Sequence, residues 1–122
     1  MAEHNELGQR GEHIAQTFLK EKGFQILHVN WRNRKLEIDI IAMDGETLVF
    51  VEVKTRQTLI FGEPEDAVNY KKRRSLIRAA NAYVLKYGFK DDARFDIISI
   101  IIERNETVIN HFPDAFYPTL QS

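Results

Sequence analysis

The stretch LEIDIIAMDGETLVFVEVK, residues 36–54, contains two apolar runs joined by a short polar turn. Runs rich in Ile and Val favour strands, and Asp-Gly at positions 44 and 45 is a strong signal for a tight hairpin turn. We therefore expect an antiparallel hairpin with a two-residue turn at Asp44-Gly45. Its ladder pairs Met43 with Glu46, Ile41 with Leu48, Asp39 with Phe50 and Glu37 with Glu52.

Three charged residues interrupt the apolar runs, namely Asp39, Glu52 and Lys54. In the expected register their side chains project from one face, and Asp39 and Glu52 are diagonal neighbours about 7 Å apart at Cβ. The opposite face is wholly apolar and comprises Ile38, Ile40, Ala42, Val49, Val51 and Val53. Changing the turn by one residue would reverse the faces, so this prediction depends on the turn.

Charged side chains within apolar strands are costly to bury unless they pair or bind a metal. Two carboxylates at this separation can share one Mg²⁺ or Mn²⁺ ion, and the backbone carbonyl of Val53 can add another oxygen ligand. Lys54 can then orient or deprotonate an attacking water, or neutralise a phosphorane-like transition state. These groups suit phosphodiester hydrolysis. The simpler alternative is two surface carboxylates and an ion-paired lysine on a sheet edge.

The composition is that of an ordinary globular protein and indicates a single domain spanning residues 1–122. The chain has no cysteine, which excludes disulfides and thiolate zinc sites and is compatible with the cytoplasm, where we expect the protein to act. Neither a signal peptide nor an apolar run of membrane-spanning length is evident, so we expect no membrane association. The net charge of −1 argues against nonspecific coating of duplex nucleic acid.

The rest of the sequence predicts two helices and three further strands. Helices are expected at about residues 5–22 and 65–87. The further strands are expected at about residues 24–31, 94–103 and 107–112, in addition to the hairpin strands at 36–42 and 48–54. Strict alternation in the first strand places Phe24, Ile26 and His28 on one side. Each amphipathic helix must bury its apolar stripe, so this order predicts an α/β domain with a central mixed sheet flanked by helices. The first three strands then form a meander, and the second helix serves as a crossover that lets the fourth strand join in parallel or mixed fashion.

Basic residues gather on the second helix. Lys71, Arg74 and Arg78 align at i, i+3 and i+7, and this row can meet a phosphate backbone. Lys72 and Arg56 are further candidate nucleic-acid contacts. The common alternative is a solvated helix face and, for Arg56, an ordinary loop charge.

Two other acidic residues lie on the first helix and on the fourth strand of the predicted order. Glu12 shares a helical face with Ala15 and Leu19 and so borders the buried stripe, where it can serve the site or simply bond a backbone group. Asp96, on the fourth strand, is expected to anchor Arg94 or a neighbouring group structurally.

Six short motifs carry a family resemblance: LGQRGE at 7–12, NWR at 30–32, EIDIIA at 37–42, VEVKTR at 51–56, KRR at 72–74 and RFD at 94–96. Together they resemble the YraN-like family of bacterial proteins, which belongs to the restriction-endonuclease-like superfamily and is related to archaeal Holliday-junction resolvases. The resemblance covers about residues 7–112. Ile38 stands where superfamily nucleases often have Pro, and Leu36 where relatives commonly have Gly.

The resemblance implies a restriction-endonuclease-like fold and a Mg²⁺- or Mn²⁺-dependent endonuclease acting on DNA, with branched, Holliday-junction-like or single-stranded DNA as candidate substrates. Asp39 would match the metal-binding aspartate, Glu52 the second acidic ligand and Lys54 the catalytic lysine. Glu12 would match an acidic residue that approaches the same metal, directly or through water. The alternative is an inactive module on the same fold that binds nucleic acid or a protein partner. Similar resolvases act as dimers, which leaves a homodimer open.

Overall fold

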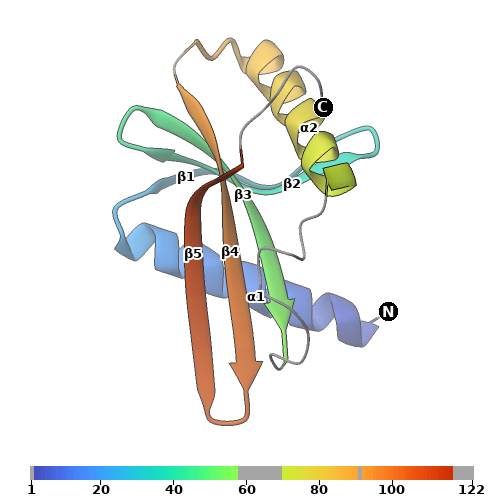
Figure 1. Ribbon diagram of the computed structural model, residues 1–122, viewed down its shortest axis with the longest axis vertical. Coiled ribbons are helices and arrows are strands. Elements are labelled where there is room, and N and C mark those ends of the chain that lie inside the picture. The colour runs from blue at the N-terminus through green and yellow to red at the C-terminus, as the bar shows by residue number, and fades with distance from the viewer. Residues whose placement is uncertain (1, 58–69, 91, 117–122) are drawn as a thin grey trace.

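The computed structural model describes residues 2–57, 70–90 and 92–116 of the chain. In these ranges the elements follow in the order α1, β1, β2, β3, α2, β4 and β5. Their bounds are Ala2–Glu21, Gln25–Asn33, Leu36–Asp44, Thr47–Arg56, Tyr70–Tyr87, Ala93–Glu103 and Glu106–Phe116. The strands form one sheet with α1 and α2 on opposite faces (Figure 1). The predicted α/β fold, a mixed sheet flanked by helices, is confirmed and is consistent with a restriction-endonuclease-like fold.

The sheet has the spatial order β1-β2-β3-β4-β5. The first three strands form an antiparallel meander, because short turns connect them. β3 and β4 pair in parallel, with Val51 opposite Asp96, and α2 provides the crossover that a parallel neighbour requires. β5 returns antiparallel to β4 and extends to Phe116, four residues beyond its predicted end at residue 112. The predicted meander and parallel crossover are therefore confirmed.

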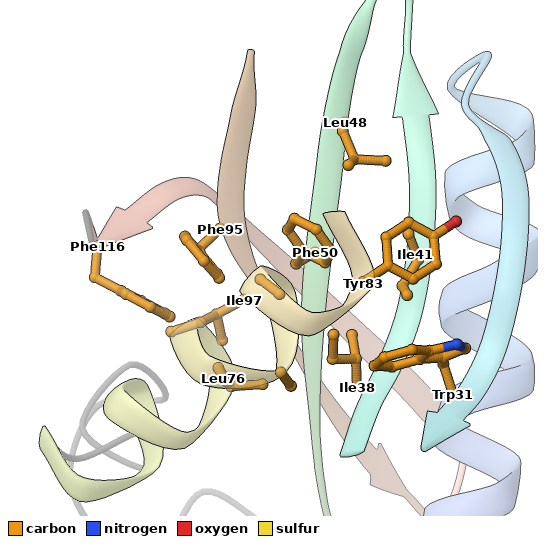
Figure 2. Packing of buried hydrophobic residues seen from close by; sticks show 12 residues of the cluster. Trp31, Ile38, Ile41, Leu48, Phe50, Leu76, Tyr83, Phe95, Ile97 and Phe116 are labelled. Atoms are coloured by element: carbon orange, nitrogen blue, oxygen red, sulfur yellow. The ribbon is translucent and has the colours of Figure 1, made fainter. Parts of the chain in front are cut away.

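Each helix covers its own apolar core. On the α2 face, the ring of Tyr83 packs against those of Trp31 and Phe50, at centroid distances of 5.3 and 5.8 Å (Figure 2). The α1 face is mostly aliphatic, and its buried residues are Ala15, Leu19, Phe24, Ile40, Ala42, Val49, Val51, Val53, Ile98 and Ile100. Burial of each large apolar side chain contributes about 1.5–3 kcal/mol, so the two cores hold the helices firmly on the sheet.

The turn between β2 and β3 lies one residue later than predicted. The observed pairs are Asp44 with Thr47, Met43 with Leu48, Ala42 with Val49, Ile41 with Phe50 and Ile40 with Val51. Gly45 and Glu46 therefore form the turn, and Gly45 adopts a φ of 63°, which favours glycine. The predicted pairing of Asp39 with Phe50 and of Glu37 with Glu52 is wrong. Because the register changes by two residues, each side chain of β3 still keeps its predicted face.

β2 changes face at Asp39. Ile38 packs in the core on the α2 face together with Ile41, whereas Ile40 packs in the core on the α1 face. Ile38 and Ile40 would share a face in a regular strand, so the prediction that they do is wrong. The pairs between β2 and β3 run only as far as Ile40 opposite Val51. Asp39 therefore lies at the point where β2 leaves β3.

β1 contains a bulge at Leu27. Its pairing with β2 shifts between Ile26 and His28, so an extra residue is accommodated there. The ring of His28 consequently lies 5.4 Å from that of Tyr83 on the α2 face, whereas Phe24 and Ile26 pack on the α1 face. The predicted alternation was wrong for His28.

Gly11 determines how closely α1 approaches the sheet. A Cβ built at Gly11 would overlap the hydroxyl of Thr55 and lie 2.8 Å from its Cβ. Only glycine fits at this contact. The middle of α1 is therefore held directly against the end of β3.

The predicted start of the second helix, at residue 65, and the loop before it lie outside the described residues. From Tyr70 onward α2 has the expected amphipathic pattern, with Leu76, Ala79, Ala80 and Tyr83 buried. No helix in the described part of the chain has the length and apolar character needed to cross a membrane.

Candidate functional site

The candidate site lies at the fork where β2 and β3 separate. Oδ2 of Asp39 accepts a hydrogen bond of 2.8 Å from the backbone N–H of Val53, which lies beyond the last β2–β3 pair. This hydrogen bond thus joins β2 to β3 just beyond the point where their backbone pairing ends. In Figure 1 the start of β2 lies beside α2, whereas the end of β3 runs toward α1. The fork is therefore within reach of both helices.

The carboxyl groups of Asp39 and Glu52 share a hydrogen bond. Burial, followed by the charge of Asp39, raises the pKa of Glu52 to about 8. Burial also raises the pKa of Asp39, although the hydrogen bond from Val53 opposes the rise. Raised pKa values are expected where two acids lie together out of water. The structure thus brings together the two acids that the sequence singled out.

Two lysines face this acidic pair. Nζ of Lys72, in the first turn of α2, lies 3.6 Å from Oε2 of Glu52; the Glu52 side chain is only 7% exposed, whereas that of Lys72 is 47% exposed. The charge of Lys72 lowers the pKa of both acids, and that of Lys54 lowers the pKa of Glu52. Lys54 follows Glu52 by two residues and so lies on the same face of β3. The structure places Lys72 against Glu52, while its contact with nucleic acid stays a prediction.

Glu12 approaches the site from α1. Burial, followed by the charge of Asp39, raises the pKa of Glu12, and a hydrogen bond from the side chain of Asn30 opposes this rise. Asn30 lies in β1 with a φ of 54°, a conformation that Asn tolerates better than most residues. Gly11 allows the close packing of α1 that brings Glu12 to this position. Glu12 thus lies beside the pair but has its own hydrogen-bond partner.

The donor set can be compared with the needs of a metal ion. Within residues 2–57, 70–90 and 92–116, no three side chains of His, Cys, Asp or Glu form a metal-binding group. At the fork, a metal ion would therefore have two carboxylate ligands, Asp39 and Glu52, together with the backbone carbonyl of Val53. Mg²⁺ and Mn²⁺ commonly use one or two carboxylates and complete their shells with water and substrate oxygens. The residues at the fork fit such a hard divalent cation.

The predicted phosphate contacts occupy two places. Lys71, Arg74 and Arg78 are exposed on α2, the helix whose first turn also contains Lys72. Arg56 ends β3 and is half-buried, on the same face as Glu52. Basic groups therefore lie on α2 and at the end of β3, the two elements that bear Lys72 and Lys54.

The sequence predicted no role for three residues of this region. Two of them, Gly11 and Asn30, position Glu12 through the close approach of α1 and a hydrogen bond. Ser99 is 1% exposed, and its hydroxyl has no hydrogen-bond partner among the described residues. It pairs with Lys54 across the parallel β3–β4 ladder. A lone serine among the isoleucines of residues 97–102 was the available signal.

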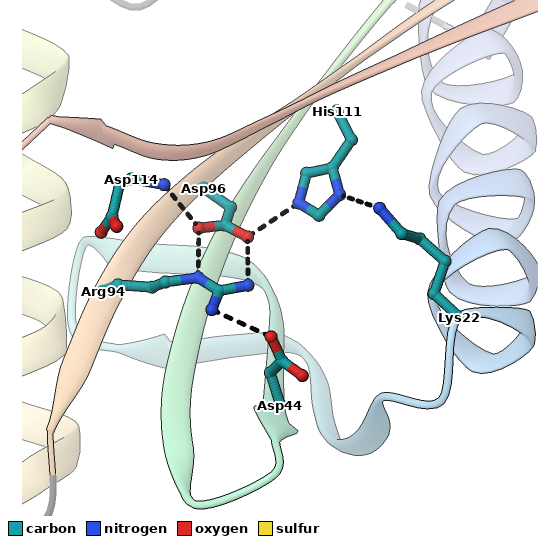
Figure 3. A network of polar contacts seen from close by, with 6 residues as sticks. All are labelled: Lys22, Asp44, Arg94, Asp96, His111 and Asp114. Carbon is teal, nitrogen blue, oxygen red and sulfur yellow. Dashed lines mark hydrogen bonds and ion pairs between the residues drawn. The ribbon is translucent and has the colours of Figure 1, made fainter.

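A second buried carboxylate lies on the opposite face of the sheet (Figure 3). Asp96 accepts hydrogen bonds from Nε of Arg94 at 3.0 Å, from Nε2 of His111 at 2.7 Å and from the backbone N–H of Asp114 at 3.1 Å. Lys22 lies 3.0 Å from Nδ1 of His111. Burial alone would raise the pKa of Asp96, but the hydrogen bonds lower it below its ordinary value. The predicted structural role of Asp96 is confirmed.

The fold and the site together define a class: an α/β protein of restriction-endonuclease-like architecture with two carboxyl groups paired at a strand fork. The model of the uncharacterised protein family UPF0102 matches residues 11–100. The chain belongs to this family, which is the YraN family that the motifs indicated.

Relatives resemble the chain over nearly its whole length. It is 50% identical over 117 residues to a UPF0102 protein of Flavobacterium psychrophilum, covering 96% of this chain and 98% of the relative. It is 47% identical over 120 residues to one of Bacteroides thetaiotaomicron, covering 98% and 99%. A UPF0102 protein of Christiangramia forsetii is 48% identical over 117 residues, covering 96% and 98%. The family name specifies no activity.

Proposed function

We propose that this protein is a metal-dependent nuclease that hydrolyses phosphodiester bonds in DNA. One observation carries the proposal: Asp39 and Glu52 are held side by side at the strand fork, where burial opposes the charge of both. A divalent cation between them would compensate both charges, and a protein gains nothing in stability from holding two such acids together. Such pairs are typical of functional sites.

The residues around the pair have separate roles in this proposal. Asp39, Glu52 and the carbonyl of Val53 would hold Mg²⁺ or Mn²⁺. The bound ion supplies a Lewis acid at a phosphoryl oxygen and lowers the pKa of its water. Lys54, on the same face as Glu52, orients or deprotonates the attacking water or neutralises charge that develops on the phosphate. Glu12, held by Asn30, binds water on the α1 side.

Contacts to the substrate backbone are assigned to the basic residues of α2 and β3. Lys71, Arg74 and Arg78 are exposed and can reach phosphates, and Arg56 lies on the face that bears the acidic pair. Branched and single-stranded DNA are the candidate substrates, because the family is related to junction resolvases. A resolvase makes two cuts, which would require two copies of the site and so a homodimer.

Binding of Mn²⁺ provides the first test. We expect wild-type protein to take up Mn²⁺, measured as the loss of the free-ion electron paramagnetic resonance signal, and Asp39→Asn to abolish this uptake. Glu46→Gln, in the exposed turn of the same hairpin, is the matched control and should bind as wild type does. Identical isotherms for wild type and Asp39→Asn would remove the basis of the proposal.

Cleavage provides the second test. A panel of junction, flap and single-stranded DNAs should contain at least one substrate that wild type cuts with Mn²⁺. Lys54→Ala should slow this cleavage by roughly a hundredfold or more, as expected for loss of a group that assists proton transfer, while Mn²⁺ binding persists. Undiminished activity in Lys54→Ala would show that the role of Lys54 is wrongly assigned.

A second function has one observation in its favour. Lys72 already compensates Glu52 at 3.6 Å, as expected if the acids served only to hold α2 in a binding module. Such a module would bind DNA or a protein partner without a metal and would not cut. Equal DNA affinity in EDTA and in Mn²⁺, together with no cleavage of the panel, would favour it over the nuclease.

A further inference from the structure

We propose that Lys72 of α2 is a positioning residue of the acidic site: its ammonium group takes the place of the cation beside Glu52 in the metal-free protein, and metal binding must displace it. This inference rests on the proposed function, because it concerns the same two carboxyl groups. In this proposal Lys72 contacts Glu52 within the site, whereas the sequence had suggested a contact with the phosphates of a nucleic acid.

The geometry of the ion pair supports this role. Nζ of Lys72 lies 3.6 Å from Oε2 of Glu52, on the face of β3 that also bears Lys54. Glu52 is almost completely buried, and its carboxyl group also contacts that of Asp39. The ammonium group therefore already lies where a positive charge compensates that of Glu52.

The position of Lys72 on α2 explains how it reaches the fork. The buried stripe of α2 consists of Leu76, Ala79, Ala80 and Tyr83. Lys72 precedes Leu76 by four residues, so it continues this stripe by one turn toward the N-terminus. Its aliphatic stem can therefore follow the inner face of the helix while the charged end reaches Glu52. Lys71 points elsewhere on the helix, because it is offset by about 100°.

The difference in exposure indicates which partner can move. The side chain of Lys72 is 47% exposed, whereas that of Glu52 is 7% exposed and fixed within the sheet. The ammonium group of Lys72 lies at the more exposed end of the ion pair, where water can solvate its charge when it moves away from Glu52. Glu52 has no comparable freedom. The lysine is therefore the group that yields to an entering metal ion.

Lys72 and Lys54 also differ in what they act on. The charge of Lys72 acts on both Asp39 and Glu52, whereas the charge of Lys54 acts on Glu52. A cation that faces both acids is the one that substitutes for a bridging metal ion. Lys54 can thus remain in place when the metal binds, as its proposed catalytic role requires.

The affinity of Mn²⁺ tests the displacement. Lys72→Met removes a competing charge and should tighten Mn²⁺ binding by roughly tenfold, the order expected for one partly solvated charge at this distance. Lys86→Met is the matched control, with the same change in the last turn of the same helix, and should bind as wild type does. Lys72→Arg keeps the charge and should restore the wild-type affinity. Unchanged or weaker binding in Lys72→Met would overturn the inference.

The melting temperature in EDTA tests the ion pair without a metal. We expect Lys72→Met to lower the melting temperature when it is introduced into the wild-type protein. Introduced into the Glu52→Gln variant, it should leave the melting temperature almost unchanged, because the ion pair is already lost there. Equal decreases in both backgrounds would show that Lys72 acts elsewhere. Absence of Mn²⁺ binding to wild type would instead overturn the proposed function together with the displacement. The two failures can therefore be told apart.

Discussion

Two buried carboxylate groups, those of Glu52 and Asp96, lie on neighbouring strands and differ in every other respect. Asp96 on β4 pairs with Val51, next to Glu52 on β3, yet their side chains point to opposite faces of the sheet. Asp96 accepts hydrogen bonds from two side chains and a backbone N–H, and its pKa is lowered. Glu52 shares a hydrogen bond with another acid, and its pKa is raised to about 8.

The contrast separates the structural role of Asp96 from the functional role proposed for the pair of Asp39 and Glu52. Arg94, His111 and the backbone of Asp114 compensate the desolvation of Asp96, so this carboxylate is stable as an ion and joins β4 to β5. The pair of Asp39 and Glu52 is compensated only in part by Lys72 and Lys54. The protein retains an arrangement that costs stability, which is the pattern expected of a binding site.

The largest effect is expected from Asp96→Asn. Loss of the carboxylate leaves the Arg94 guanidinium with a weakened partner and removes the charge that His111 bonds, so we expect a decrease of about 3–5 kcal/mol in the free energy of unfolding. Urea denaturation at neutral pH measures it.

The same substitution at the fork is the control for this comparison. Asp39→Asn relieves the crowding of two acids, so in EDTA it should leave the free energy of unfolding unchanged or raise it. Comparable losses in Asp96→Asn and Asp39→Asn would mean that both carboxylates are structural, and the contrast between them would disappear.

Gly11→Ala should disturb the acidic site of Asp39 and Glu52 but leave the hydrogen bonds of Asp96 intact. The new Cβ would overlap Thr55 and force α1 away from the end of β3, at a cost of about 1–3 kcal/mol in the free energy of unfolding. Mn²⁺ binding should weaken because Glu12 moves with α1. The hydrogen bonds of Asp96 should persist, because they lie near Lys22 at the other end of α1.

Gly8→Ala is the matched control for that substitution. Apart from its neighbours along the helix, no atom of the described residues lies within 4 Å of a Cβ built at Gly8. Alanine there should therefore raise the free energy of unfolding by about 0.5–1 kcal/mol through its better helix propensity. A loss at Gly8 as large as that at Gly11 would show that the contact with Thr55 is not the cause.

The two regions should also respond oppositely to pH. The pKa of Glu52 in the folded protein, about 8, exceeds its ordinary value of 4.5, so protonation favours folding. In EDTA, the contribution of Glu52 is therefore complete below pH 4.5 and is lost as the pH rises toward 8, by about 1 kcal/mol or more. Asp96 contributes stability above its ordinary pKa of 3.8, and this is lost in acid.

Urea denaturation from acid to mildly alkaline pH separates these contributions. Glu52→Gln should flatten the alkaline limb of the curve and leave the acid limb unchanged, because the amide does not titrate. An unaltered alkaline limb in this variant would show that another group causes the loss of stability.

Much of the site could be read from the sequence, because strand parity survives an error in the turn. The predicted turn was one residue too early, yet Glu52 and Lys54 kept their face, since the register changed by an even number of residues. The meander and the parallel crossover followed from the order of the elements and the short turns.

The distortions of single strands could not be predicted in the same way. The bulge at Leu27 and the change of face at Asp39 depend on contacts between strands that are distant in sequence, and alternation assumes that such contacts are regular. The approach of Lys72 to Glu52 was predictable in principle. Lys72 continues the apolar stripe of α2, as Glu12 continues that of α1 by preceding Ala15 by three residues.

The smallest effect is expected at Ser99, which connects the two regions because it lies on β4 with Asp96 and pairs with Lys54 of the acidic site. Its buried hydroxyl lacks a hydrogen-bond partner among the described residues, so Ser99→Ala should raise the free energy of unfolding slightly, by about 0.5–1 kcal/mol. The melting temperature in EDTA measures this effect. A decrease of similar size would mean that the hydroxyl bonds Lys54 in solution, and Ser99 would then belong with the acidic site.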